Sequence, residues 1–223
     1  GGNVTECRAE RIENADTITA FYNASDESSR LKKNRHSQIE FLISMKYLQA
    51  VIPENSRILD CCAGTGIYAF ALAKQHRVVA GDLSEKHIAQ MKELQKDAPQ
   101  LEEIHWLDAR HMDIFEDESF DAVLCMGALY HLFSHEDRMN AIRECVRLCK
   151  KGGILVFAYL NKWGNFYNGM INNLKPMDLL YREFDSGNHE DIFFRTTAEE
   201  VNAMCQALNL ICLYNIGVDH LAF

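Results

Sequence analysis

The chain has 223 residues, of which 48% are hydrophobic and 25% charged, with a formal net charge of −9 and an isoelectric point near 5.5. This length suffices for one domain with a sizeable core, and the acidic balance excludes the basic footprint that neutralises the phosphates of a long nucleic acid. No apolar run reaches the roughly 20 residues that cross a bilayer and no leader pattern is evident, so we expect a cytoplasmic protein without a membrane partner.

The first expected element is a helix. Residues 1–33 are polar and show no strand pattern, which fits a frayed N-terminal helix. From residue 35 to 50, apolar side chains recur at helical spacing, so one face of this helix can pack on a sheet. Pro53 ends the segment.

The stretch 58–66, Ile-Leu-Asp-Cys-Cys-Ala-Gly-Thr-Gly, indicates a strand, a tight turn and the start of a helix at Ile67. Gly64 and Gly66 let the backbone turn sharply and approach a ligand closely, while the first N–H groups of the helix face the same place. The spacing Gly64-x-Gly66-x-x-Ala69 also fits a dinucleotide loop, so a nicotinamide or flavin cofactor has to be weighed.

Two acids at the ends of consecutive strands bear on this choice. Asp60 would repel a pyrophosphate but would attract the ammonium of an amino-acid cofactor, directly or through water. Asp82 follows the strand 77–81 and is placed to accept hydrogen bonds from two ribose hydroxyls. A cationic nucleoside without phosphates suits both acids, whereas a dinucleotide suits the second alone.

Further strands alternate with helices. Ser84 caps a helix that runs to about residue 97, and strands follow at 104–107, 121–126 and 154–159. Ser134 with Asp137 resembles a capping box, and we expect its helix to end at the lysines and glycines of residues 150–153. Parallel strands joined by right-handed crossovers give a doubly wound, mostly parallel α/β sheet.

The segment 161–195 interrupts this alternation with many aromatic residues. Its rings either cap a substrate or fasten a small helical flap to the core, and the two roles are compatible. Thr197 with Glu200 again indicates a capping box, followed by a helix to about residue 208 and a sixth strand at 210–216.

The eight cysteines are scattered through apolar segments with no C-x-x-C pair at metal spacing. We therefore expect small buried hydrophobes, and neither a disulfide framework nor a bound metal. Cys145 and Cys149 lie one helical turn apart, but zinc would need ligands that their sequence neighbourhood does not supply.

The stretches 58–66, 80–84, 108–110 and 120–132 together resemble a class I S-adenosylmethionine-dependent methyltransferase, in order and spacing over roughly residues 35–160. The resemblance implies a Rossmann-like single domain: an N-terminal lid (1–33), a cofactor-binding core (34–160), a cap insertion (161–195), and a last helix and strand (196–223). The family usually adds a seventh, antiparallel strand, for which little sequence remains. Cys62 stands where the family commonly has glycine, so the turn must keep a negative φ there.

The resemblance also implies site residues. Those expected to hold the cofactor, S-adenosyl-L-methionine, are Tyr22, Arg30, Asp60, Cys62, Ala63, Gly64, Thr65, Gly66, Asp82, Leu83, Asp108, Ala109, Arg110, Met126 and Gly127. Tyr22 and Arg30 belong to the lid, Asp108 and the backbone of Ala109 to an adenine corner, and Met126 with Gly127 to the methionine portion. Asp108 is also compatible with a solvated turn acid.

Tyr130, Trp163 and Tyr167 are expected on the substrate side, and His131 is the candidate general base because its unperturbed pKa is useful near neutral pH. A histidine in this place also fits a simple hydrogen bond to the backbone.

The implied function is methyl transfer to a small-molecule acceptor by in-line displacement. A nicotinamide-dependent oxidoreductase and a non-catalytic S-adenosylmethionine-binding partner subunit stay open as alternatives.

Overall fold

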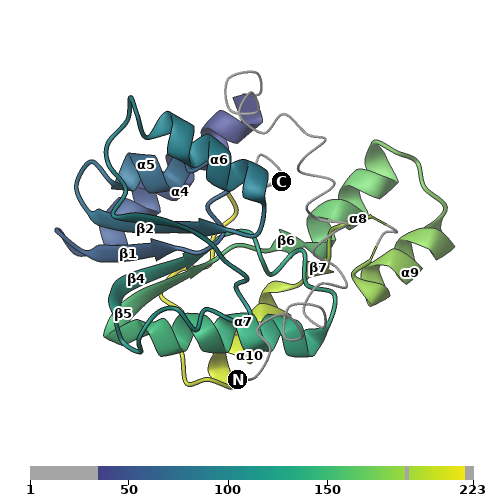
Figure 1. Ribbon diagram of the computed structural model, residues 1–223. Coiled ribbons are helices and arrows are strands. Elements are labelled where there is room, and N and C mark those ends of the chain that lie inside the picture. Colours follow the sequence, from purple (N-terminus) through teal and green to yellow (C-terminus); the bar gives the residue numbers. More distant parts are fainter. Residues whose placement is uncertain (1–34, 189–190, 219–223) are drawn as a thin grey trace, which may run out of the picture.

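The computed structural model describes residues 35–188 and 191–218. In this part of the chain, five parallel strands form a central sheet in the order β3-β2-β1-β4-β5 (Figure 1). The strands are β1 (Arg57–Asp60), β2 (Arg77–Asp82), β3 (Glu103–Trp106), β4 (Phe120–Cys125) and β5 (Cys149–Phe157). The predicted doubly wound parallel sheet is therefore confirmed.

Helices cover both faces of the sheet (Figure 1). One face carries α4 (Arg35–Val51), α5 (Ile67–Leu72) and α6 (Glu85–Leu94), and the other carries α7 (His135–Leu148) and α10 (Ala198–Gln206). Successive strand residues point to opposite faces, so Ile58 packs in the core under α4 to α6 while Leu59 packs in the core under α7 and α10. Among the described helices, none is long and apolar enough to pass through a lipid bilayer.

The strand order reverses between β1 and β4. The chain proceeds outward from β1 through β2 to β3, then returns to place β4 on the other side of β1. In an open parallel sheet the crossovers diverge at such a point and leave a crevice beyond the carboxyl ends of the strands. The turns after β1, β2 and β4 all begin there.

The three N-caps inferred from the sequence are present, although Ser134 forms a single cap contact and, among these three, Thr197 alone has a full capping box. Ser84 Oγ accepts a hydrogen bond from the His87 amide at 3.4 Å, and Ser134 Oγ accepts one from Asp137 at the same distance. Thr197 and Glu200 form a full capping box, with the side chain of each accepting from the backbone of the other. Local sequence thus determines where these helices start.

The helix α7 ends within one residue of its predicted end, but the residues predicted to cap it belong to another element. The helix stops at Leu148, and the two lysines and two glycines that follow lie inside β5. There the pairing with β4 shifts from Phe120–Cys149 to Ala122–Ile154, and Gly152 adopts φ 76° in the irregular segment. The glycine that was expected to end the helix instead accommodates a bulge in the strand.

The predicted sixth strand is also wrong. Residues 207–218 contain no strand, and Ile211 and Leu213 are 85% and 62% exposed. The segment runs beside β5, where Asn215 accepts a hydrogen bond from the Tyr159 hydroxyl at 2.8 Å. The sequence has the apolar composition of a strand, but the segment forms no hydrogen-bonded ladder with β5, whose outer edge is unpaired in the described sheet. The seventh strand of the family is likewise absent from the described residues.

The insertion forms a helical pair beside the sheet (Figure 1). It contains α8 (Lys162–Ile171) and α9 (Met177–Ser186), and the short strands β6 (Leu160–Asn161) and β7 (Arg195–Thr196) pair at its base. The rings of Trp163 and Phe184 lie 4.5 Å apart between centroids, and Phe166 lies 5.8 Å from Phe184. These aromatic contacts hold α8 against α9 within the insertion.

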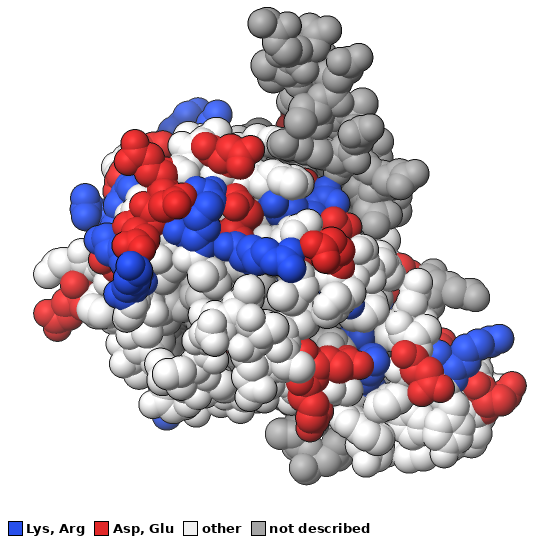
Figure 2. Space-filling view, turned by 90° about the horizontal axis from the view of Figure 1, so that it is seen from below, with Lys and Arg blue, Asp and Glu red and all other residues white. Residues whose placement is uncertain are grey.

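Figure 2 shows one face of the molecule. Lysine and arginine side chains alternate there with aspartate and glutamate along one side, and a broad uncharged area lies next to them. Opposite charges are thus interspersed on this face, which offers no continuous basic stripe.

Candidate functional site

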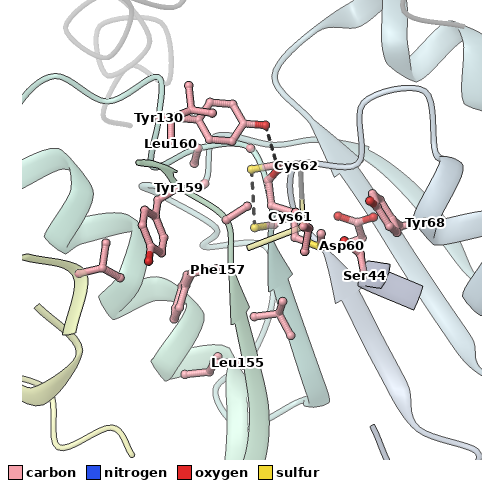
Figure 3. Close-up of a pocket in the computed structure, with 18 of the residues that line it drawn as sticks. Ser44, Asp60, Cys61, Cys62, Tyr68, Tyr130, Leu155, Phe157, Tyr159 and Leu160 are labelled. Atoms are coloured by element: carbon pink, nitrogen blue, oxygen red, sulfur yellow. Dashed lines mark hydrogen bonds between the residues drawn. The ribbon is translucent and has the colours of Figure 1, made fainter. Parts of the chain in front are cut away.

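A cavity of about 2000 Å³ opens at the carboxyl edge of the sheet. Its walls come from the turns after β1, β2, β3 and β4, from α4, and from α8 of the insertion. Small-molecule pockets commonly enclose about 300–1,000 Å³, and this cavity is larger because it continues along the outer side of β5 from Gly152 to Leu160. Figure 3 shows Tyr159 and Phe157 on the β5 side and Asp60, Ser44 and Tyr68 on the opposite side.

The turn after β1 has the shape expected from its glycines. Gly64 and Gly66 adopt φ values of 56° and 86°, in the left-handed region that favours glycine. The Ala63 amide donates to the Gly81 carbonyl at 2.9 Å, and the Gly66 amide donates to the Ala63 carbonyl at 2.8 Å. Cys62 is not among the described non-glycine residues with positive φ, so the prediction of a negative φ at this position is confirmed.

Cys62 is matched to Gly127 across the cavity floor. A Cβ added at Gly127 would lie 2.8 Å from Cys62 Cβ, closer than two carbon atoms can approach without displacement. The side chain that replaces the family's glycine therefore fills the space left by a glycine after β4.

Asp60 is the most buried acid of the site. It is 2% exposed, and among the described residues no lysine or arginine forms an ion pair with it. Burial and, to a smaller extent, the charge of Asp82 raise the pKa of Asp60 from 3.8 to about 7, although the Cys62 amide partly opposes this by hydrogen bonding to the carboxylate. A buried carboxylate in this state is well matched to a ligand that brings a positive charge.

Asp82 binds the protein before any ligand arrives. Its Oδ2 accepts from the Gly64 amide at 2.8 Å, and its Oδ1 accepts from the Ser84 amide at 2.8 Å. His87 Nδ1 lies 3.0 Å from the same Oδ1. The carboxylate thus joins the turn after β1 to the start of α6, and it still has lone pairs for a hydroxyl donor because a carboxylate has about four acceptor positions.

Asp108 and Arg110 form one unit. The Arg110 backbone amide donates to Asp108 Oδ1 at 2.9 Å, and its guanidinium donates to Oδ2 at 2.8 Å through Nη2. The guanidinium also lies 3.4 Å from Asp137 at the start of α7. Asp108 is 8% exposed, so the alternative of a solvated turn acid is wrong. The hydrogen bonds from Arg110 hold the Asp108 carboxylate in place.

Tyr130 and His131 line the cavity in the segment that follows β4. The Tyr130 hydroxyl donates to the Met126 carbonyl at 3.0 Å (Figure 3). His131 Nδ1 lies 3.0 Å from the Ile192 carbonyl oxygen, which can only accept, so Nδ1 carries the proton and Nε2 is the basic nitrogen. Burial lowers the pKa of His131 despite this hydrogen bond, which keeps the ring neutral at pH 7.

The structure brings most of the predicted site residues together at this one cavity. The cavity is lined by Asp60, Cys62, Ala63, Gly64, Thr65, Asp82, Leu83, Asp108, Ala109, Arg110, Met126, Gly127, Tyr130, His131, Trp163 and Tyr167. Gly66 is not among the lining residues, but it belongs to the turn after β1, where it adopts a left-handed φ. Tyr22 and Arg30 lie outside the described residues.

Sequence reasoning missed three contributors. His87 contacts Asp82, Ser44 of α4 lines the wall beside Asp60, and the Phe193 ring lies 5.1 Å from that of His131. The position of His87 one turn into α6 could have revealed it, because the capping serine places that residue over the end of β2. Ser44 and Phe193 had no such signal, since their approach depends on tertiary packing.

Comparisons with known proteins agree with this geometry. A family model described as a methyltransferase domain matches residues 58–153. A ubiquinone biosynthesis O-methyltransferase of Paracidovorax citrulli is 32% identical over 173 residues, covering 75% of this chain and 68% of that protein. The enzyme of the same name from Hydrogenovibrio crunogenus is 27% identical over 201 residues, covering 89% and 78%.

The fold also matches a solved structure. A crystal structure from Methanosarcina mazei, described as a SAM-dependent methyltransferase, aligns with a TM-score of 0.59 at 19% identity. The alignment covers 72% of this chain and 82% of that one.

The burial of Asp60 predicts a dependence of stability on pH. Its folded-state pKa lies above the unfolded value, so between about pH 4 and pH 7 the folded state binds more protons and its stability falls as pH rises. Relative to Asp60→Asn, the ligand-free protein should lose on the order of 4 kcal/mol between pH 4 and pH 8, because each tenfold change in a protonation equilibrium corresponds to about 1.4 kcal/mol. Urea unfolding of both proteins measures this difference, and parallel pH profiles would contradict it.

The contact between Cys62 and Gly127 predicts a specific clash. Gly127→Ala should lower the free energy of unfolding by about 1–3 kcal/mol, because the added methyl group overpacks the cavity floor. Gly164→Ala is the matched control, since a Cβ there meets no atom within 4 Å.

In a double-mutant cycle, Cys62→Gly should recover at least about 0.5 kcal/mol of the loss caused by Gly127→Ala. Strictly additive effects in urea unfolding would show that the two residues are not matched.

Proposed function

This chain belongs to the S-adenosylmethionine-dependent methyltransferases, and we propose that it transfers the methyl group of S-adenosylmethionine to a small-molecule acceptor by in-line displacement. The observation that carries the proposal is the convergence of Asp60, Asp82 and the left-handed turn at Gly64 on one cavity. A buried acid without a basic partner among the described residues suits a cationic cofactor that carries no phosphate.

The residues present fit this cofactor. Asp60 is suited to its ammonium group, and Asp82, whose bonds hold the loop beneath it, is suited to the ribose hydroxyls. Asp108 keeps acceptor capacity for an exocyclic amine beyond its bonds to Arg110. Met126 and Gly127 follow β4 and are suited to the methionine portion.

When bound, the cofactor supplies an electrophilic methyl group on a sulfonium, so the chain needs no metal for this chemistry. Its residues have to align the attacking atom, exclude water and accept a proton. His131 is suited to the last role because its protonated Nδ1 is held by Ile192, which leaves Nε2 as the proton acceptor. In the proposed reaction the bound cofactor would supply its methyl group to the attacking atom and its sulfur would keep the bonding electron pair, while His131 Nε2 would accept the acceptor's proton.

The acceptor we infer is a small ring compound with an ionisable hydroxyl group. The relatives from Paracidovorax and Hydrogenovibrio are named for O-methylation in ubiquinone biosynthesis. In this chain, the rings of Tyr130, Phe193 and Trp163 line the side of the cavity where the acceptor would lie, and such rings favour a flat apolar partner. The interspersed charges in Figure 2 support a partner other than a long nucleic acid.

The nicotinamide alternative has less support. It shares the glycine turn, but a pyrophosphate would have to approach Asp60 and Asp82 together, and the charge of Asp82 already raises the pKa of Asp60. The alternative of a non-catalytic cofactor-binding subunit predicts the same cavity and differs in turnover alone.

Binding and turnover test the proposal together. Calorimetry of the full chain should give saturable binding of S-adenosylmethionine and S-adenosylhomocysteine and none of NADH. Incubation with labelled S-adenosylmethionine and a panel of phenols, catechols and other hydroxylated rings should transfer label to at least one acceptor. Binding of NADH in place of the two nucleosides would overturn the assignment, and binding without transfer to any acceptor would favour the non-catalytic subunit.

The role of His131 has its own test. His131→Asn keeps an N–H donor near the position of Nδ1 for the Ile192 carbonyl but removes the base, so at saturating cofactor the rate should fall by about 10²–10⁴-fold. The dissociation constant for S-adenosylhomocysteine should stay unchanged.

Because burial lowers the pKa of His131, the wild-type rate should decline with falling pH only below about pH 6.5. The His131→Asn variant should lack this decline. An unchanged rate in the variant would show that His131 serves the structure alone.

A further inference from the structure

Three cysteines that are distant in sequence meet beneath the turn after β1. The sulfur atoms of Cys61, Cys125 and Cys145 all lie within 4.8 Å of one another, and each residue is at most 1% exposed. The spacing of cysteines along the chain did not reveal this group, because its members are 64 and 20 residues apart. None of the three is among the residues proposed to hold the cofactor or the acceptor, although Cys61 also lines the cavity.

The fold fixes this convergence from three directions. Asp60 pairs with Leu124 in the parallel ladder, and the Cys61 amide continues it by donating to the Leu124 carbonyl at 2.9 Å. Cys61 and Cys125 therefore follow the ladder side by side and enter the same core. Cys145 belongs to the buried face of α7, which packs on that side of the sheet.

We propose that Cys61, Cys125 and Cys145 bind one soft divalent metal ion, of the class of Zn²⁺ and Cd²⁺, as three thiolates. At a zinc–sulfur distance of about 2.3 Å, three sulfurs around one ion lie roughly 4 Å apart. The observed group is within 1 Å of this separation, so side-chain rotation can close the difference.

The chemistry of the donors selects the ion. Three thiols and no carboxylate or imidazole make up the group, which favours soft ions over calcium or magnesium. On binding, three S–H bonds break, three metal–sulfur bonds form and three protons pass to solvent, with no change of oxidation state. A divalent ion leaves one net negative charge in the apolar core, whereas a monovalent ion would leave two at a greater cost.

Cys62 connects the group to the cavity. It is half-buried, lines the cavity wall, and places its sulfur 3.9 Å from that of Cys61 (Figure 3). An ion that reaches the cavity therefore meets one accessible thiol before the three buried ones. Once bound, the ion would link the ends of β1 and β4 to α7. It would thereby stabilise the turn after β1.

Cadmium titration of the full chain without cofactor tests the proposal. The background variant carries serine at Cys212, which is exposed, and at Cys7, which lies outside the described residues. We expect one Cd²⁺ per chain, an ultraviolet thiolate-to-cadmium charge-transfer band, and a rise in the thermal unfolding midpoint. Cys145→Ala should abolish the band and weaken binding at least tenfold.

Cys149→Ala is the matched control, since this cysteine follows the same helix and is buried but lies outside the group. It should bind Cd²⁺ like the background protein. Circular dichroism verifies the fold of each variant, and Cys125→Ala replaces Cys145→Ala if the latter does not fold. Absence of the charge-transfer band in the background protein, or equal binding by the Cys145 and Cys149 variants, would overturn the proposal. Neither result depends on methyl transfer.

Discussion

The site depends on a carboxylate that the fold removes from water and leaves without a basic partner among the described residues. Asp60 ends a buried strand, and its pKa rises to about 7 because burial and the neighbouring Asp82 both disfavour its charge. Such a group weakens the free protein and is stabilised by a cation that enters the cavity. This arrangement supports the proposed preference of the cavity for a cationic ligand, because such a ligand would offset the unfavourable burial of Asp60.

Backbone contacts hold the Asp82 carboxylate in a fixed position near Asp60. The same carboxylate holds the turn through the Gly64 amide and the start of α6 through the Ser84 amide. Because both contacts use backbone donors, the loop is ordered before a ligand arrives and little entropy is lost on binding. In the turn after β3, the Arg110 guanidinium likewise fixes the Asp108 carboxylate by a hydrogen bond.

The parts of the molecule that local chemistry determines could be predicted from the sequence: the strand ends at Asp60 and Asp82, the glycine turn, and the helix capped by Thr197. The errors arose where structure depends on a distant partner. Residues 210–216 have strand composition but do not pair with the open edge of β5, and Gly152 serves a bulge whose existence depends on β4. The contacts of Ser44, Phe193 and the three clustered cysteines likewise join elements far apart in sequence, so periodicity carries no trace of them.

The hydrogen bond from His131 to the Ile192 carbonyl joins two residues 61 positions apart, one in the core and one in the insertion. Because this carbonyl accepts a hydrogen bond from Nδ1, Nε2 is the basic nitrogen of the ring. In the proposed reaction, the insertion would therefore affect the basicity of His131 as well as the fit of the acceptor, because substitutions near position 192 can act on the base without touching the acceptor. Under this proposal, a change in the insertion would alter the preferred acceptor and the pH optimum of the reaction together.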